Sequence, residues 1–258
     1  MLKNKKGIIF GIANDHSIAW GIAKKLAENG AEIAITYQND TFFKRVKPLA
    51  EKIGSKLLIE CDFSKEKSIE NCFKEVKKKF HNIDFVIHAA AFSDKNELNG
   101  KYLNTSKENF INTLNISCYS FTLISKLAST MMNEGGSLLT LTFYGSSKVM
   151  PNYNVMGIAK AALETSVKYL SVDLGSQNIR VNAVSAGPMR TLAGAAIANA
   201  REVYNYTQEH SALKRNADLD EIGKTALYFV SDLSLSVTGE IHYVDCGFNI
   251  IGMPKSKI

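Results

Sequence analysis

Residues 7–21 read Gly7-Ile8-Ile9-Phe10-Gly11-Ile12-Ala13-Asn14-Asp15-His16-Ser17-Ile18-Ala19-Trp20-Gly21, a short apolar run followed by a glycine turn and an amphipathic segment. This order predicts a strand near residues 7–12, a turn at Gly11 and a helix near residues 17–29 that Ser17 caps. Gly11 lets the backbone approach a phosphate group, and the N–H groups and dipole at a helix N-terminus favour negative charge. The segment therefore indicates a phosphate-binding turn, although it lacks the Gly-x-Gly-x-x-Gly fingerprint and an ordinary strand-to-helix turn would share its pattern.

The rest of the chain repeats this order of strand and then helix. Short apolar runs predict further strands near residues 31–37, 56–61, 84–90, 136–142, 179–185 and 240–245. Amphipathic segments predict helices near residues 41–53, 64–80, 106–133, 153–175 and 218–232, and a less regular one near 192–209. The alternation indicates an α/β fold of the Rossmann type, which is a doubly wound, seven-stranded parallel sheet with helices on both faces.

No linker, repeat or low-complexity tract divides the chain, so we expect a single NAD(P)-binding domain over residues 1–258. The segment from Thr191 to Leu213 differs from the rest because it is rich in alanine and poor in large core residues. We expect residues 191–213 to form a mobile helical segment that closes over a substrate.

The composition excludes several classes of protein. With 45% hydrophobic and 22% charged residues, the chain has neither a disordered nor a fibrous composition. Its net charge of +6 favours anionic partners, but the lysines are scattered and form no arginine-rich stripe, so nucleic-acid binding is not expected. No run approaches the roughly 18 to 20 apolar residues of a membrane span. The four widely spaced cysteines form no metal motif, and we expect them to be reduced thiols in a cytoplasmic protein.

Polar or small residues follow the second, third and fourth predicted strands. These are the segments Tyr37-Gln38-Asn39-Asp40, Asp62-Phe63 and Ala89-Ala90-Ala91. Each alone is compatible with a helix cap or tight packing, but together they lie where a parallel sheet binds a dinucleotide. Since no Arg or Lys follows the second strand to receive a 2′-phosphate, NADH is favoured over NADPH.

The densest chemical signal is Pro151-Asn152-Tyr153-Asn154-Val155-Met156-Gly157-Ile158-Ala159-Lys160-Ala161-Ala162-Leu163-Glu164. Tyr153 and Lys160 are seven residues apart, which puts them on one face of the predicted helix and about 10 Å apart along its axis. That spacing suits two side chains that flank a nicotinamide ribose. The alternative is a capped helix with an incidental Tyr and a solvated Lys.

The irregular segment from Ser185 to Thr191, after the sixth strand, could bond the nicotinamide carboxamide.

With these segments the sequence resembles the short-chain dehydrogenase/reductase superfamily over nearly the whole chain, and more closely its divergent branch, the bacterial enoyl-acyl-carrier-protein reductases. Ordinary members carry Tyr-x3-Lys, whereas this branch carries Tyr-x6-Lys within a phrase that residues 151–157 reproduce. The segments 17–19, 36–40 and 185–191 also resemble sequence motifs of that branch.

The resemblance implies NADH-dependent reduction of the trans-2 double bond of enoyl-acyl-carrier-protein thioesters in type II fatty-acid elongation. It implies that Tyr153 hydrogen-bonds the thioester oxygen and that Lys160 holds the ribose hydroxyls. It also implies a homotetramer and an acidic carrier protein as partner. The implied NADH-site residues are Gly11, Ser17, Ile18, Gln38, Asp62, Phe63, Ala90, Lys160, Met189 and Thr191, and the implied substrate-site residues are Phe143, Ser93 and Met156.

One departure from the family leaves alternatives open. Many members have a second Tyr ten residues before the catalytic one, where this chain has Phe143 followed by Tyr144. We interpret Phe143 as pocket wall, because a phenyl ring cannot donate a proton, and Tyr144 is the equivalent if the loop is shifted. Tyr144 and Lys148 formally satisfy the Tyr-x3-Lys pattern of a ketone reductase or alcohol dehydrogenase, but Gly145 and Pro151 argue against a regular helix there. A non-enzymatic NADH sensor is the third hypothesis.

Overall fold

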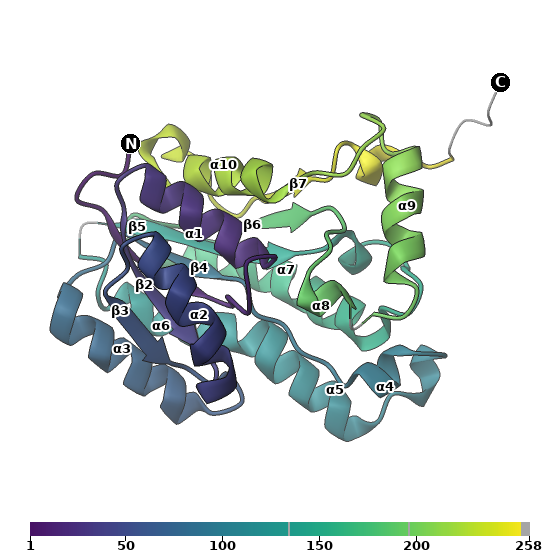
Figure 1. Cartoon of the computed structure of the whole chain (residues 1–258), viewed down its shortest axis with the longest axis horizontal. Helices are drawn as coiled ribbons and strands as arrows, with labels where there is room; N and C mark the ends of the chain where they lie inside the picture. The colour runs from purple at the N-terminus through teal and green to yellow at the C-terminus, as the bar shows by residue number, and fades with distance from the viewer. Residues whose placement is uncertain (134, 196, 254–258) are drawn as a thin grey trace.

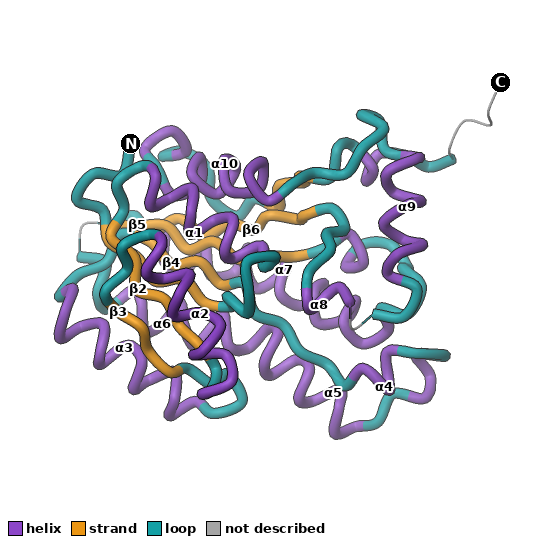
Figure 2. The backbone as a smooth tube through the Cα atoms, viewed as in Figure 1, coloured by secondary structure: helices purple, strands orange, loops and turns teal. Residues whose placement is uncertain are grey.

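A computed structural model describes residues 1–133, 135–195 and 197–253 of the chain, and its centre is a sheet of seven parallel strands (Figures 1 and 2). The strand order is β3-β2-β1-β4-β5-β6-β7. All seven strands lie at their predicted places, and the α/β fold is confirmed. Their bounds are β1 Lys6–Phe10, β2 Glu32–Tyr37, β3 Leu57–Glu60, β4 Phe85–His88, β5 Gly136–Thr142, β6 Ile179–Ala186 and β7 Ile241–Val244.

Helices cover both faces of the sheet. One face carries α1 (Ile18–Glu28), α2 (Asp40–Lys52) and α10 (Leu219–Val230), and the other carries α3 (Glu66–Phe80), α6 (Ser120–Ser129) and α7 (Asn154–Gly175). The remaining helices are α4 (Lys95–Leu98), α5 (Lys107–Leu114), α8 (Leu192–Ala195) and α9 (Ala200–His210). These four gather beyond the carboxyl ends of the strands (Figure 1). None of the helices in the described part of the chain is long and apolar enough to cross a membrane.

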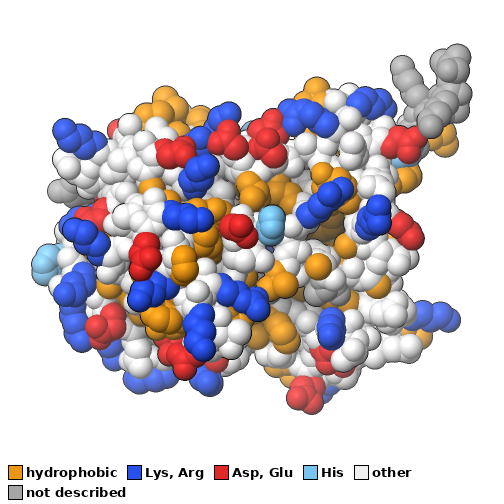
Figure 3. All heavy atoms as spheres, in the orientation of Figure 1, with side chains coloured by type: hydrophobic (Ala, Val, Ile, Leu, Met, Phe, Trp, Pro, Cys, Tyr) orange, Lys and Arg blue, Asp and Glu red, His pale blue; other side chains and the backbone are white. Residues whose placement is uncertain are grey.

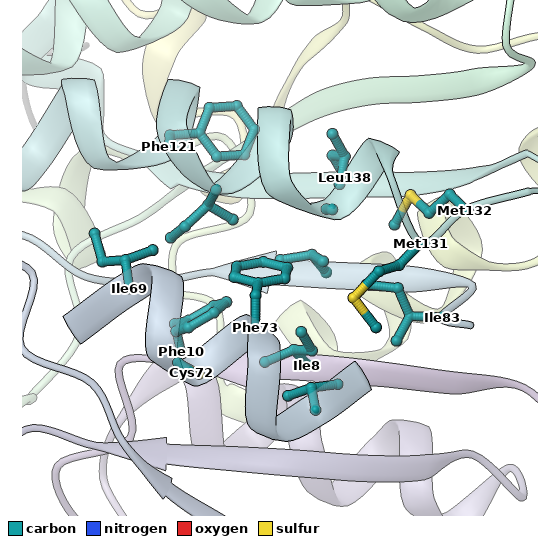
Figure 4. Close-up of a cluster of buried hydrophobic side chains, with 14 of the residues drawn as sticks. Ile8, Phe10, Ile69, Cys72, Phe73, Ile83, Phe121, Met131, Met132 and Leu138 are labelled. Atoms are coloured by element: carbon teal, nitrogen blue, oxygen red, sulfur yellow. The ribbon is translucent and has the colours of Figure 1, made fainter. Parts of the chain in front are cut away.

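The sheet separates two hydrophobic cores because successive side chains of a strand point to opposite faces. In β1, Ile8 and Phe10 enter the core beneath α3, α6 and α7, whereas Ile9 enters the core beneath α1, α2 and α10. Phe10 there meets Phe73 of α3, and both lie near Phe121 of α6 (Figure 4). A strand buried on both faces needs a continuous apolar run, which is why short apolar runs located these strands.

The helix predicted near 106–133 is present and unbroken from Lys107 to Ser129, so it ends four residues earlier than predicted, and it contains a π-helical stretch. It consists of α5, one π-helical stretch at Asn115–Tyr119, and α6, which ends at Ser129. Near this stretch the Ser120 hydroxyl donates to the Ile116 carbonyl at 2.7 Å and also meets His88 Nε2 at 2.9 Å. A π-turn accommodates one extra residue for such contacts, and a periodicity of 3.6 cannot reveal it.

The prediction of one helix near 192–209 is wrong, because the segment contains two helices, α8 and α9. Asn199, in the left-handed conformation with φ of 60°, stands at the N-cap of α9 and breaks the run after α8. Ala196, within the predicted segment, lies outside the described residues. The short helix α4 was not predicted. It begins where the Asp94 carboxylate accepts a hydrogen bond from the Asn96 N–H at 2.9 Å.

Candidate active site

A cavity of about 860 Å³ lies at the carboxyl edge of the sheet. The ends of β4, β5 and β6 form its floor, and α4, α5, α7 and the α8–α9 segment form its walls. Apolar side chains gather around a hollow on this side of the molecule (Figure 3). The cavity brings together a large part of the predicted site, namely Ile18, Ala90, Ser93, Phe143, Tyr153, Met156, Lys160, Met189 and Thr191.

The turn after β1 passes directly against the end of β4. Gly11 has a φ of +96°, and a Cβ atom there would lie 2.2 Å from the Ala89 carbonyl oxygen. Only glycine therefore fits, and the turn keeps its backbone bare beside the cavity. The first N–H groups of α1, beginning at Ile18, have no acceptor within the helix, which favours an anion at this end.

Ser17 occupies the N-cap of α1, but its hydroxyl does not cap the helix as predicted. The Ser17 Oγ instead accepts hydrogen bonds from the N–H groups of Ala13 at 3.0 Å and Asn14 at 3.1 Å. The turn folds back over the Ser17 hydroxyl. Its hydrogen-bond donors therefore come from the preceding loop and not from the first turn of α1. Ser17 thus fixes the shape of the turn.

The side chains after β2 and β3 do not line the cavity. Gln38 is exposed, and the next residue, Asn39, accepts hydrogen bonds from Thr41 and Phe42 to cap α2. Asp62 accepts hydrogen bonds from the N–H and hydroxyl of Ser64 at 3.0 and 2.8 Å. Burial alone would raise the pKa of Asp62, but the Ser64 hydrogen bonds and nearby Lys65 outweigh it and lower that pKa.

Phe63 is placed differently from the lining residue that the resemblance implies. Its ring stacks on His88 with the ring centroids 5.5 Å apart and an interplanar angle of 8°, and it also contacts Phe10. The aromatic ring is therefore part of the core, because a large apolar side chain gains more from burial there than at an open edge. Only the backbone of Phe63 is left to meet a nucleotide.

Tyr153 stands at the N-cap of α7, one residue before the helix begins. Its ring lies over Gly145, where a Cβ atom would come within 2.5 Å of the ring, and it meets Phe143 edge-on with centroids 5.1 Å apart. The residue is only 6% exposed. Burial raises the pKa of the Tyr153 phenol well above its ordinary value, and the negative charge of Glu164 adds to this. The phenol keeps its proton at neutral pH and can donate it in a hydrogen bond.

Lys160 lies farther along α7 and lines the same cavity. Its Nζ donates to the carbonyl of Leu141 at the end of β5, at 2.7 Å, and the residue is 6% exposed. Burial lowers the pKa of Lys160 to about 8, although Glu164 opposes the shift. The alternative in which Lys160 is a solvated surface residue is therefore wrong.

Tyr144 and Lys148 do not form a second site. Tyr144 begins a 3-10 turn, Tyr144–Ser146, and its ring packs edge-on against Phe248 with centroids 5.6 Å apart. Lys148 is exposed, and neither residue is among those lining the cavity. Phe143, in contrast, does line it. The geometry thus favours Tyr153 over Tyr144 as the phenol that faces a substrate.

Sequence reasoning missed two contributors to the site. The first is the wall around α4, whose residue Leu98 is buried against Tyr153 and Met156. The second is Glu164, which accepts a hydrogen bond from the Thr142 hydroxyl at 2.6 Å. The spacing of four residues between Lys160 and Glu164 was a usable signal, since such residues are neighbours on a helix.

Comparison with known proteins agrees with this geometry. Residues 11–249 match a family model described as enoyl-(acyl carrier protein) reductase. The chain is 55% identical to enoyl-[acyl-carrier-protein] reductase [NADH] 2 of Rhizobium meliloti, over 98% of this chain and 95% of that protein. It is similar to the crystal structure of FabI from Candidatus Liberibacter asiaticus, with a TM-score of 0.97, 54% identity and 98% of each chain covered. A reductase of Anaplasma phagocytophilum, solved in complex with NAD, gives a TM-score of 0.94 at 52% identity, covering 98% of this chain and 95% of that one. By its sequence and its fold, the chain belongs to the enoyl-acyl-carrier-protein reductase family.

Proposed function

We propose that this chain is an NADH-dependent enoyl-acyl-carrier-protein reductase, which reduces the trans-2 double bond of enoyl thioesters in type II bacterial fatty-acid elongation. The observation that carries the proposal is the buried pair Tyr153 and Lys160 on one apolar cavity at the carboxyl edge of the sheet. The relatives support it, since the Rhizobium meliloti protein is named for NADH and the Anaplasma phagocytophilum structure contains NAD.

The residues at this edge fit a nicotinamide dinucleotide. The bare turn at Gly11 and the start of α1 at Ile18 would receive the pyrophosphate. Lys160 would hold the ribose hydroxyls. The other residues proposed to hold the cofactor are Ser17, Gln38, Asp62, Phe63 through its backbone, Ala90, Met189 and Thr191. When bound, NADH supplies the hydride that is added to the β-carbon of the enoyl group.

Tyr153 would stabilise the charge that develops on the substrate. As the double bond is reduced, negative charge gathers on the thioester oxygen, and a protonated phenol can donate a hydrogen bond to that oxygen. Such a preorganised donor is commonly worth a factor of about 10² to 10³ in rate. Lys160, mostly protonated below its pKa of about 8, adds positive charge nearby.

The cavity walls would hold the acyl chain. Phe143 and Met156 offer apolar surface, and Met156 is 6% exposed. The hydroxyl of Ser93, also proposed to contact the substrate, is in a hydrogen-bond network with Asn109, at 3.2 and 3.3 Å. A network of this kind fixes the hydroxyl before a substrate arrives.

Steady-state oxidation of NADH with crotonyl and longer enoyl thioesters, compared with acetoacetyl thioesters, tests the proposal. We expect turnover of the enoyl thioesters. Preference for acetoacetyl thioesters would make the protein a ketone reductase. Tight NADH binding without turnover of either substrate would make it a sensor.

We also propose that one domain, 1–258, assembles as a homotetramer. Support comes from large apolar side chains that are exposed on α7, where Tyr169 and Val172 are 73% and 80% exposed, and on α5, where Ile111 is 56% exposed. Apolar side chains that gather in one exposed patch often mark a protein interface. Sedimentation that shows a monomer at all concentrations would contradict the tetramer.

The proposed partner is an acidic acyl carrier protein, and the proposed location is the cytoplasm. The net charge of +6 supports the partner, and four unpaired cysteine thiols support a reducing compartment. Near the α8–α9 segment, which we propose to be mobile, Arg201 is exposed. Arg215 contributes less, because both its terminal nitrogens bind the Glu221 carboxylate at 2.7 and 2.8 Å.

A further inference from the structure

The two residues beside Tyr153 share an unusual backbone conformation. Asn152 has a φ of 57° and Asn154 a φ of 39°, both in the left-handed region. Asparagine adopts this region more readily than other side chains except glycine. Each of the two side chains reaches a different wall of the cavity.

Asn154 holds the wall formed by α4. Its Nδ2 donates toward the carbonyls of Glu97, Leu98 and Gly100, at 3.3, 3.1 and 3.2 Å. A helix of four residues, as α4 is, is too short to be stable by its own hydrogen bonds. The Asn154 amide therefore supplies partners at the end of α4 that the helix cannot supply for itself.

Asn152 holds the opposite wall. Its Nδ2 donates to the carbonyl of Ala198, between α8 and α9, at 3.1 Å. The neighbouring Ile197 packs against the small cluster that contains Tyr153, and Leu98 of the first wall is 4% exposed in the same cluster. Ile197 and Leu98 both line the cavity. Both walls are thus tied to the residues that flank the phenol.

We infer that Asn152 and Asn154 are positioning residues that fix the two walls relative to Tyr153 and thereby set the length of acyl chain that the cavity accepts. The inference rests on the proposed function for its substrate. Neither amide donates to a residue that we propose to hold the cofactor, so loosening a wall should affect the acyl cavity more than the cofactor site.

The test uses glycine variants of the full chain. Asn152→Gly and Asn154→Gly keep the left-handed backbone available and remove only the amide. The matched control is Asn178→Gly, which changes another left-handed asparagine, with a φ of 59°, beyond the other end of α7. Melting temperatures of all three variants show whether each one is folded.

The kinetic readout is kcat and KM for dodecenoyl and crotonyl thioesters. A long chain contacts both walls and a short one contacts them little. We expect each variant to change the preference between the two substrates by roughly 2- to 10-fold, mainly in KM, which is what the loss of one net hydrogen bond gives. The Kd of NADH should be the same in both variants as in the unaltered protein. The control variant Asn178→Gly should keep the substrate preference of the unaltered protein. An unchanged preference in both variants overturns the role in chain length.

Hydrogen exchange, measured without substrate, gives a readout that does not depend on activity. Asn154→Gly should speed exchange in residues 95–104, and Asn152→Gly should speed it in residues 197–204, each without affecting the other segment. Unchanged exchange rates in both segments would contradict the claim that Asn152 and Asn154 stabilise the two walls. If the unaltered protein does not reduce enoyl thioesters, the proposed function fails, while the exchange experiment still decides the positioning role.

Discussion

Tyr153 and Lys160 lie in the same apolar environment, which shifts their pKa values in opposite directions. Burial disfavours the charged form of each, so it raises the pKa of the phenol and lowers that of the ammonium group. The carboxylate of Glu164, held by the Thr142 hydroxyl at 2.6 Å, raises both pKa values. At neutral pH the site therefore holds a neutral hydrogen-bond donor beside a mostly protonated amine.

Replacing Tyr153 by Phe removes the donor and leaves the ring packing on Gly145 and Phe143. We expect kcat for enoyl thioesters to fall by about 10²- to 10³-fold, because the developing negative charge loses its hydrogen bond. The NADH affinity should remain nearly unchanged. Steady-state kinetics and an NADH titration measure the two quantities. Full activity in Tyr153→Phe together with inactivity in Tyr144→Phe would reverse the assignment.

The charge of Lys160 should produce an alkaline limb in the pH profile. Since its pKa is lowered to about 8, the ammonium group loses its proton as the pH rises through 8, and kcat/KM for NADH should then fall. Glu164→Gln removes a charge that raises this pKa, so the limb should move to lower pH.

Lys160→Ala is the control for that profile. It should weaken NADH binding at neutral pH and abolish the limb, because the titrating group is gone. Other groups near Lys160 are Cys118 and His88, and burial lowers the pKa of His88 to about 3, so His88 is neutral throughout this range. A limb that stays near pH 8 in Lys160→Ala would assign it to another group.

At single positions the sequence indicated which residues belong to the site better than it indicated where their side chains point. The resemblance named Tyr153 and Lys160, and both line the cavity. It could not show that the Phe63 ring turns into the core or that the Ser17 hydroxyl serves the preceding loop. These outcomes depend on which neighbours the folded chain supplies, and those neighbours are distant in sequence or belong to an irregular turn.

At the scale of elements, predictability followed the strength of the apolar pattern. The seven strands are apolar runs buried between two layers, and they were predicted to within a few residues. The π-turn at Asn115–Tyr119 and the break before α9 at Asn199 were missed, because a helical repeat of apolar residues does not reveal a local change of hydrogen bonding or one left-handed residue. The helix α4 was missed because it has only four residues and because Asn154, more than fifty residues away, supplies hydrogen bonds at its end.

The turn between β2 and α2 should determine the choice of cofactor. It contains Gln38, Asn39 and Asp40, and no cation that could receive a 2′-phosphate. The Asn39 side chain also accepts from two N–H groups at the start of α2, which removes them as phosphate donors. We therefore expect NADH to bind much more tightly than NADPH. Titrations of the two cofactors compare them directly, and equal or tighter NADPH binding would refute this interpretation.

On the scale of the whole molecule, the sequence predicted the layers and the edge at which the cavity lies. A parallel sheet puts the carboxyl ends of all its strands on one side, so residues after β1, β4, β5 and β6 had to converge there. The depth and the remaining walls of the cavity were not predictable, because apart from α7 they come from the short helices α4, α5, α8 and α9, whose mutual placement no periodicity encodes.

The net charge of +6 should affect encounter with an acidic carrier protein. Raising the salt concentration should reduce kcat/KM for carrier-linked substrate more than for the same acyl group on a small thiol, since salt screens long-range attraction. Parallel assays over a range of ionic strength measure the two slopes. Equal slopes would mean that charge does not guide docking.

The bare backbone of Gly145 beneath Tyr153 has an evolutionary consequence. A methyl group there would occupy the space of the phenol ring, and Gly157 is confined in turn, since its own Cβ would lie 2.8 Å from the Gly145 carbonyl oxygen. Packed cores in general tolerate volume-conserving exchanges, whereas a carbon added at either glycine meets an atom within 3 Å. A lineage that no longer needed the reaction could therefore lose it through one small substitution and keep an intact nucleotide-binding scaffold, free to acquire another use.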